Sequence, residues 1–335
     1  MQKLAFISQS EYFNFIYDDS LHDDYEIRDY QMTFSMSPNE FQDLFSFNAD
    51  YNIFFRGEYI PSEVLEKLLG KNINLSSEPF PVLINNTLNY SFDSIKRFLI
   101  FRNIRHKNFD YVFHYDKSSL PFLLKDGLHL SGEFVFPVAT HIYQPKRIEK
   151  RWDVFFIGRC TTHREKYFGP VKEYNKFLDI AHGIWGRDVI DYISASKICL
   201  NIHAENEISW EPRMQMMMAC GAFVISEPIT PNDYLRPSID YVEISHPLEL
   251  LEAANYYLNN DKAREEIAKN GCERVREKLD SKILFRDLLE GINKNRYPKF
   301  ISKRGKYHWD FLNNSLSTAK HIKNRVFKPY QGVKQ

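Results

Sequence analysis

Short apolar runs that alternate with helical patterns restrict the fold of this sequence more than any other feature. In the first half, five such runs indicate buried strands. One helix is expected to start near Pro61, because proline is favourable at a first helical position, and another is expected over 91–105. Alternation of this kind is typical of a parallel sheet that is covered on both faces. The five runs cover residues 4–8, 51–55, 72–76, 109–115 and 132–139.

The same alternation of strand and helix patterns begins again after 142–151, a polar and basic segment that we interpret as a linker. Two halves with one pattern predict an α/β protein of two Rossmann-like domains, over residues 1–145 and 151–295, with a cleft between them. Ligands in such sheets bind at the carboxyl ends of strands, so the cleft is the expected site. In the second half, strands are expected over 152–158, 197–203, 222–226 and 240–245, and helices over 187–196, 211–221, 247–259 and 261–278.

Charge is balanced over the whole chain but uneven along it. The 335 residues include 44 Lys and Arg and 44 Asp and Glu, which excludes the polycationic signature of a nucleic-acid binder. Residues 1–50 carry ten acidic and two basic side chains, whereas residues 294–335 carry eleven basic side chains and one acidic.

The basic tail over 296–335 allows three interpretations. It could be a solvated basic helix, a weak contact with an anionic membrane surface or with an acidic acceptor, or a segment that packs on the acidic first domain. We expect a helix that crosses back to the first domain, because a disordered tail is normally poor in aromatic residues. The aromatic residues of this tail are Tyr307, Trp309, Phe311, Phe327 and Tyr330.

The sequence favours a cytoplasmic protein. A cytoplasmic protein that also contacts the inner face of the membrane through its tail is the alternative. The apolar run at the N-terminus is too short for a signal peptide, and no 18-residue apolar stretch exists for a transmembrane helix. The four cysteines lack zinc-finger or CxxC spacing, and no carboxylates have the D-x-D spacing that would hold a metal with a nucleotide. We therefore expect no metal and no cofactor.

The turn after the first strand of the second half is a candidate anion site. Gly158 and Arg159 end the strand, and Arg164 lies in the helix that follows. Backbone N–H groups and the helix dipole at such a turn favour an anion, and the two arginines could bind a diphosphate directly. The alternative is that both arginines are solvated loop residues.

The densest polar cluster of the chain follows the strand at 197–203. His203 is a candidate acid or base, with a core-edge histidine as the alternative. Glu205 and Glu207 follow in the same loop, and Glu211 and Arg213 open the next helix. The four methionines of that helix, at 214 and 216–218, indicate a core-facing surface rather than a cofactor site.

The first half offers polar residues at two expected strand ends. His114 and Asp116 follow the strand near 109–115, and Arg56 and Glu58 follow the strand at 51–55. Each pair could line the cleft or face solvent. The G-x-S-x-G pattern of a serine hydrolase is absent.

Residues 109–290 resemble the group 1 glycosyltransferases of the GT-B fold, in the branch related to the spore-maturation protein CgeB. The matching pieces occur in the order that is typical of that branch. They are FDYVFHYD (109–116), FPVATHIYQP (136–145), WDVFFIGRCTTHR (152–164), HGIWGRDV (182–189), KICLNIH (197–203) and PRMQMMMACGAFVISE (212–227).

The resemblance implies a metal-independent transfer of a sugar from a nucleotide-sugar donor, held by the second domain, to an acceptor hydroxyl, with retention of configuration. The acceptor could be a glycan, a lipid-linked sugar, a protein or a nucleobase. By resemblance, Arg159 and Arg164 would bind the donor diphosphate, Arg213 matches an arginine of the branch, and Glu227 stands where the branch has an aspartate. From these matches and from the strand ends together, we expect Gly158, Arg159, Arg164, Glu211, Arg213 and Glu227 to bind the donor, and His114, Asp116, His203 and Glu207 to be catalytic.

One departure from the family pattern leaves other functions open. Met216 stands where the family has the glutamate that binds the donor ribose, and Ile208 stands at the upstream glutamate of the pair. A non-catalytic protein of this fold that binds a nucleotide or glycan is therefore the main alternative, and a nucleotide-sugar epimerase is the second.

Overall fold

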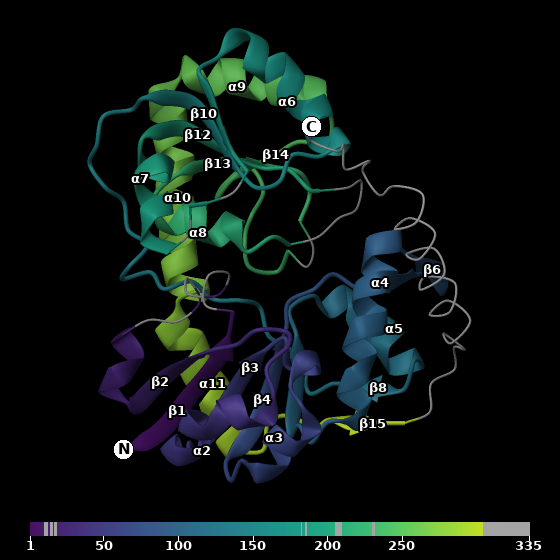
Figure 1. Ribbon diagram of the computed structural model, residues 1–335. Coiled ribbons are helices and arrows are strands. Elements are labelled where there is room, and N and C mark those ends of the chain that lie inside the picture. The colour runs from purple at the N-terminus through teal and green to yellow at the C-terminus, as the bar shows by residue number, and fades with distance from the viewer. Residues whose placement is uncertain are drawn as a thin grey trace, which may run out of the picture.

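The computed structural model describes residues 1–303 except 10–12, 14–15, 17–18, 182, 185, 205–209 and 230–231. The chain forms two lobes, each built on a parallel sheet with helices around it (Figure 1). This arrangement confirms the predicted α/β class with two Rossmann-like units. Residues 304–335 lie outside the described part, so the expected helix in the tail stays a prediction.

The first sheet has the strand order β2-β1-β3-β4-β7-β9, and all neighbouring strands are parallel. Every residue of β3 is buried, as expected for a central strand that helices cover on both faces. The strands are β1 (Gln2–Ser8), β2 (Tyr25–Gln31), β3 (Tyr51–Phe55), β4 (Lys71–Ser76), β7 (Tyr111–His114) and β9 (Gly132–Glu133).

The helices of the first lobe are short and lie between these strands in sequence. Ser91 begins the longest of them by accepting a hydrogen bond from the Ser94 backbone N–H, which satisfies one of the free donors of the first turn. The helices are α2 (Gln42–Phe47), α3 (Ser62–Lys67), α4 (Phe92–Phe101) and α5 (Leu120–Lys125); a hairpin of β5 (Val82–Ile84) and β6 (Thr87–Asn89) and the short strand β8 (Leu128–His129) complete the lobe.

The second sheet has the order β11-β10-β12-β13-β14 and is also parallel. Its strands are β10 (Trp152–Ile157), β11 (Phe177–Ile180), β12 (Ser196–Asn201), β13 (Phe223–Ser226) and β14 (Val242–Glu243). Its helices are α6 (Thr162–Tyr174), α7 (Val189–Ser194), α8 (Arg213–Ala219), α9 (Pro247–Leu258) and α10 (Asp261–Lys278).

Over residues 1–303, as far as the structure describes them, the chain crosses between the lobes twice, and the two crossings are hydrogen-bonded to each other. The first crossing is the segment 134–151, and the second joins α10 to α11 (Ser281–Asn293). The Val138 N–H donates to the Leu279 carbonyl at 2.8 Å, and the Ser281 N–H donates to the Val138 carbonyl at 3.0 Å.

Helix α11 packs on the first sheet, although it lies within the range 151–295 expected for the second domain. The rings of Phe285 and Phe6 meet edge to face with centroids 5.2 Å apart. After α11, strand β15 (Ile301–Ser302) pairs antiparallel with β8 of the first lobe. The chain has thus returned to the first lobe before residue 296. None of the helices within the described residues is long and apolar enough to cross a bilayer.

Candidate functional site

The carboxyl ends of β10, β12 and β13 meet at one edge of the second sheet, and the polar residues predicted there lie together. Gly158 directly follows β10 and has a φ of +144°, a conformation that favours glycine. A Cβ atom at this position would lie 2.7 Å from Nη1 of Arg213. Glycine is therefore required for the close approach of the Arg213 side chain to this turn.

Arg164 is a buried arginine that fixes the loop around it. Its residue exposure is 3%, and each guanidinium nitrogen donates to a protein oxygen. Nε donates to the Ile202 carbonyl at 2.9 Å, Nη1 to the Arg159 carbonyl at 2.7 Å, and Nη2 to Glu211 Oε1 at 3.0 Å. Burial lowers the pKa of Arg164, and Glu211 opposes that shift. The predicted side chain is at the site, but it faces inward.

Arg213 opens α8 and is held in the same way. Nε donates to Asn201 Oδ1 at 3.0 Å, and Nη1 donates to the Ile157 carbonyl at 2.9 Å. Its guanidinium and that of Arg164 each lie 4.9 Å from the ring centre of Phe156, within cation–π range. Burial lowers the pKa of Arg213 to about 10, against the attraction of Glu211.

Glu211 is the shared counter-ion of the two arginines. One carboxylate oxygen accepts from Arg164, and the other pairs with Arg213. Burial alone would raise the pKa of Glu211, but Arg213, His203 and Arg164 outweigh it and hold that pKa at about 2. The carboxylate therefore stays ionised at any physiological pH.

His203 and Glu227 form a second polar group beside this cluster. The Glu227 carboxylate accepts from the His203 backbone N–H at 2.7 Å and lies 2.9 Å from Nε2 of His163. Nε2 of His203 donates to the Pro228 carbonyl at 2.7 Å, and Nδ1 lies 3.9 Å from Glu211. His203 is 2% exposed, so in this conformation it supports the site from inside. His163 was not predicted from the sequence.

Arg159 is the exposed arginine of the site. It lies between the end of β10 and the first turn of α6, where Thr161 caps the helix by accepting from the Arg164 N–H at 3.2 Å. The 13-residue helix α6 places its positive dipole end beside Arg159. This turn can therefore bind an anion through the exposed guanidinium of Arg159 and the N-terminus of α6.

The first lobe contributes His114 and Asp116 at the carboxyl end of β7. His114 is fully buried and stacks on Phe80 with ring centres 4.6 Å apart, and burial lowers its pKa to about 3. Its imidazole is therefore neutral near pH 7. Asp116 caps the following turn by accepting from the Ser118 N–H at 2.8 Å, and burial raises its pKa.

Glu133 is a further acidic residue at this edge that sequence reasoning missed. It is the register partner of His114 in the sheet, and burial raises the pKa of its carboxyl. Burial and the charge of Glu133 together raise the pKa of Tyr234, from the second lobe, to about 12. The sequence signal was misleading, because Glu133 was expected within a strand at 132–139 rather than at the end of one.

Two contacts join the lobes near the site. Lys117 of the first lobe pairs with Asp233 of the second, both exposed. The buried side chain of Gln215 in α8 donates to the Phe136 carbonyl at 2.8 Å. The carboxyl edges of the two sheets are thereby held on the same side of the molecule.

The remaining predicted residues have different places. Glu58 is buried and Arg56 is half-buried, and the two side chains pair with each other at 2.7 Å. Glu205 and Glu207 lie outside the described residues. The methionines of α8 are buried in the main core, as predicted. Within the residues that the structure describes, no three His, Cys, Asp or Glu side chains are grouped to hold a metal ion.

Solved structures that are similar to this chain include glycosyltransferases and a sucrose-phosphate synthase. An α-glucosyltransferase in complex with UDP-glucose and DNA containing an abasic site has a TM-score of 0.62 at 11% identity, over 88% of this chain and 99% of that one. HepE from Anabaena, in complex with UDP-glucose, has a TM-score of 0.59 at 11% identity, over 88% and 100%. Sucrose-phosphate synthase from Thermosynechococcus elongatus has a TM-score of 0.57 at 10% identity, over 88% and 100%. These likenesses define the class of the fold as GT-B.

The sequence of the second lobe gives a more particular assignment. Residues 151–290 match the family model described as "Glycosyl transferase-like". That range holds β10 to α10 and the whole arginine cluster, and the match confirms the predicted enzyme class. No curated protein matches the chain. The branch related to CgeB stays a prediction.

Proposed function

We propose that the protein transfers a glycosyl group from a nucleoside diphosphate sugar to an acceptor hydroxyl, with retention and without a metal. The observation that carries this proposal is the arginine cluster at the carboxyl edge of a glycosyltransferase domain. Arg164 is buried and Arg213 is half-buried, and Glu211 pairs with both, while Arg159 remains exposed beside the N-terminus of α6. This leaves one solvent-facing cation where a diphosphate would bind.

In the proposed reaction, the bond between C1 of the sugar and the phosphate oxygen breaks, and that oxygen takes the electron pair. Arg159 and the dipole of α6 stabilise the charge that develops on the diphosphate. The acceptor oxygen bonds to C1 on the face that the diphosphate leaves, and its proton passes to the departing phosphate oxygen. Retention places these two oxygens side by side, so no separate base is needed.

The buried residues act as positioning groups. Arg164 and Arg213 donate to the carbonyls of Arg159, Ile157 and Ile202. These carbonyls lie at the ends of β10 and β12, around the proposed diphosphate site, which we call the donor turn. Ion pairs with Glu211 keep both guanidinium groups in place. His114 is a neutral, fully buried imidazole at the carboxyl end of β7, and we propose that it positions this edge of the first sheet rather than carrying charge.

Uridine diphosphate is the donor nucleotide to test first. The α-glucosyltransferase and HepE structures that share the fold were solved with UDP-glucose, which supports this choice. Met216 lies at the position of the family's ribose-binding glutamate and is 9% exposed. The ribose is therefore proposed to be held by another residue of the donor turn.

The decisive experiment is isothermal titration of the full chain with UDP, comparing Arg159→Ala with Lys166→Ala. Lys166 is an exposed cation in the same helix and is the matched control. Loss of Arg159 is expected to weaken UDP binding by about 1–3 kcal/mol, the range for charge-assisted hydrogen bonds, and loss of Lys166 by much less. Equal affinity in the wild type and Arg159→Ala would place the donor elsewhere.

A non-catalytic nucleotide-binding protein is the second candidate, because Met216 replaces a donor-binding carboxylate. The two candidates differ in turnover rather than in binding. Release of UDP from UDP-glucose, measured with a coupled assay in the presence of a mixture of acceptors, supports the transferase. Tight UDP binding with no release from any UDP-sugar would favour the non-catalytic protein.

A further inference from the structure

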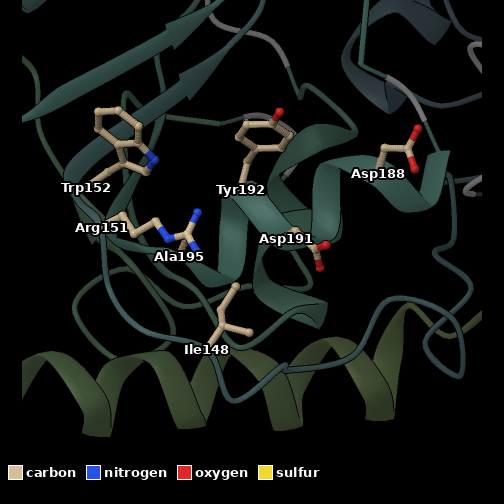
Figure 2. A pocket seen from close by; sticks show the side chains of 7 residues that line it. All are labelled: Ile148, Arg151, Trp152, Asp188, Asp191, Tyr192 and Ala195. Carbon is tan, nitrogen blue, oxygen red and sulfur yellow. The ribbon is translucent and has the colours of Figure 1, made fainter.

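A cavity of about 480 Å³ lies in the second lobe, away from the arginine cluster (Figure 2). This volume is within the range of small-molecule sites. In the view of Figure 2, Trp152 and Tyr192 lie above the cavity and Ile148 lies below it, with the Arg151 guanidinium reaching between them. The lining residues are Ile148, Arg151, Trp152, Asp188, Asp191, Tyr192 and Ala195.

The cavity is at the opposite end of the sheet from the proposed donor turn. Trp152 is the first residue of β10, and Gly158 follows its last residue. A strand of this length spans about 20 Å. The Arg151 and Trp152 N–H groups donate to the Ala195 carbonyl, at 2.7 and 3.2 Å, which fixes the linker against the end of α7. The two sites are therefore separate.

Four polar groups in this cavity have no protein partner among the described residues. They are the guanidinium of Arg151, the indole N–H of Trp152, the carboxylate of Asp188 and the hydroxyl of Tyr192. Asp191 pairs with Lys146 at 2.5 Å. At the donor turn, in contrast, every guanidinium nitrogen of Arg164 and Arg213 donates to a protein oxygen. The cavity combines two aromatic rings with unused donors and acceptors.

From this combination we propose that the cavity binds a neutral oligosaccharide. A sugar ring has an apolar C–H face that packs on aromatic rings, and hydroxyls around its rim that both donate and accept hydrogen bonds. Asp188 would accept from hydroxyls, while Arg151 and the Trp152 indole would donate to them. Nucleotides fit less well, because the unpaired carboxylate of Asp188 would repel their phosphates.

Because the cavity is about 20 Å from the donor turn, the sugar bound there is not the one that reacts. It holds a distant part of a glycan, which would raise the local concentration of its free end near the cleft. The inference does not rest on the proposed function, since a protein without transferase activity could bind a glycan at this place.

The test is isothermal titration of the full chain with maltopentaose and, separately, chitopentaose. Arg151→Ala and Asp188→Ala remove exposed groups of the cavity, and Arg147→Ala, in the same linker but outside the lining, is the matched control. At least one of the two sugars is expected to bind. Its Kd is expected to rise at least about tenfold in the two cavity variants, the effect of losing about one good hydrogen bond, and to stay unchanged in Arg147→Ala.

UDP titrations of the same variants separate this inference from the proposed function. Unchanged UDP affinity together with lost oligosaccharide binding supports a separate glycan site. Three results overturn the inference: neither pentasaccharide binds with a Kd below about 1 mM, binding is equal in all variants, or a Lys-rich peptide binds at the cavity in place of the sugars.

Discussion

Glu211 shows how single residues determine the donor turn. Two buried arginines beside each other would repel, and each would lose its hydration. The carboxylate between them forms an ion pair with each and so reduces their repulsion, and carbonyls from the surrounding turns accept their remaining N–H groups. The sequence located Gly158, Arg164, Glu211 and Arg213, because strand ends and helix starts could be recognised. It could not show that both arginines point inward, since that depends on the carbonyls of Arg159 and Ile202.

Replacing Glu211 by glutamine is expected to destabilise the protein by about 3 kcal/mol near pH 7, since it leaves two buried guanidinium groups without a counter-charge. The pKa of Glu211 is lowered from 4.5 to about 2. Its stabilising contribution is therefore complete above about pH 4.5 and is lost as the pH falls toward 2. Urea unfolding across this range should show the difference from the wild type shrinking with acidity.

The exposed Glu173 provides the control for that experiment, because no partner constrains it among the described residues. Glu173→Gln is expected to leave the unfolding free energy within about 0.5 kcal/mol of the wild type. A Glu211→Gln protein as stable as Glu173→Gln at pH 7 would contradict the role of Glu211 as shared counter-ion.

Two glycines of the same lobe should respond to alanine in opposite directions. Gly158→Ala is expected to cost about 1–3 kcal/mol and to weaken UDP binding, because its φ is positive and the new Cβ would displace Arg213. Gly169 lies inside α6 with no atom within 4 Å of a Cβ, so Gly169→Ala should stabilise by about 0.5–1 kcal/mol. Melting temperatures and UDP titrations check both, and a neutral Gly158→Ala would show that the turn adapts.

Among the helices and strands, those with a clear pattern of apolar residues could be predicted from the sequence. Strand β3 and helix α10 have the bounds expected from sequence, 51–55 and 261–278. The run at 132–139 was only partly correct, because after Glu133 the chain leaves the sheet as a buried crossing that contains a proline without an N–H donor.

Two strands at sheet edges were not predicted. β2 (Tyr25–Gln31) is mostly exposed or half-buried, and β11 (Phe177–Ile180) is half-buried throughout. An edge strand has few positions facing the core, so its hydrophobic signal is weak. Helix α11 was also not assigned to the first lobe, because which sheet a helix covers depends on chain crossings that a local pattern does not encode.

Helix α11 predicts a contrast between its two faces. Phe285 is fully buried against the first sheet, whereas Ile283 is 49% exposed on the same helix. Phe285→Ala is expected to lower the unfolding free energy by about 3–5 kcal/mol, and Ile283→Ala by less than about 1 kcal/mol. Urea unfolding measures both, and similar small effects would show that α11 contributes little to the first lobe.

For the whole molecule, the proposed chemistry depends on fixed cations rather than on a metal. Turnover of a UDP-sugar is therefore expected to persist in EDTA, because Arg159 and the N-terminus of α6 supply the positive charge at the donor turn. A parallel assay with EDTA already saturated with Mg²⁺ controls for the chelator itself. Loss of turnover that Mn²⁺ or Mg²⁺ restores would contradict the metal-independent mechanism.

The two bonded crossings at Val138 and Ser281 also determine how the lobes can move. Two adjacent chain crossings define a hinge axis. Rotation of the lobes about this axis strains neither crossing, whereas sliding of one lobe past the other would break both hydrogen bonds. On the open side, the exposed pair of Lys117 and Asp233 is worth only about 0–1 kcal/mol. The two crossings are thus placed to act as a hinge, and the ion pair on the opposite side resists opening only weakly. Each closing of the lobes about this hinge would bring the carboxyl edges of the two sheets together in the same orientation.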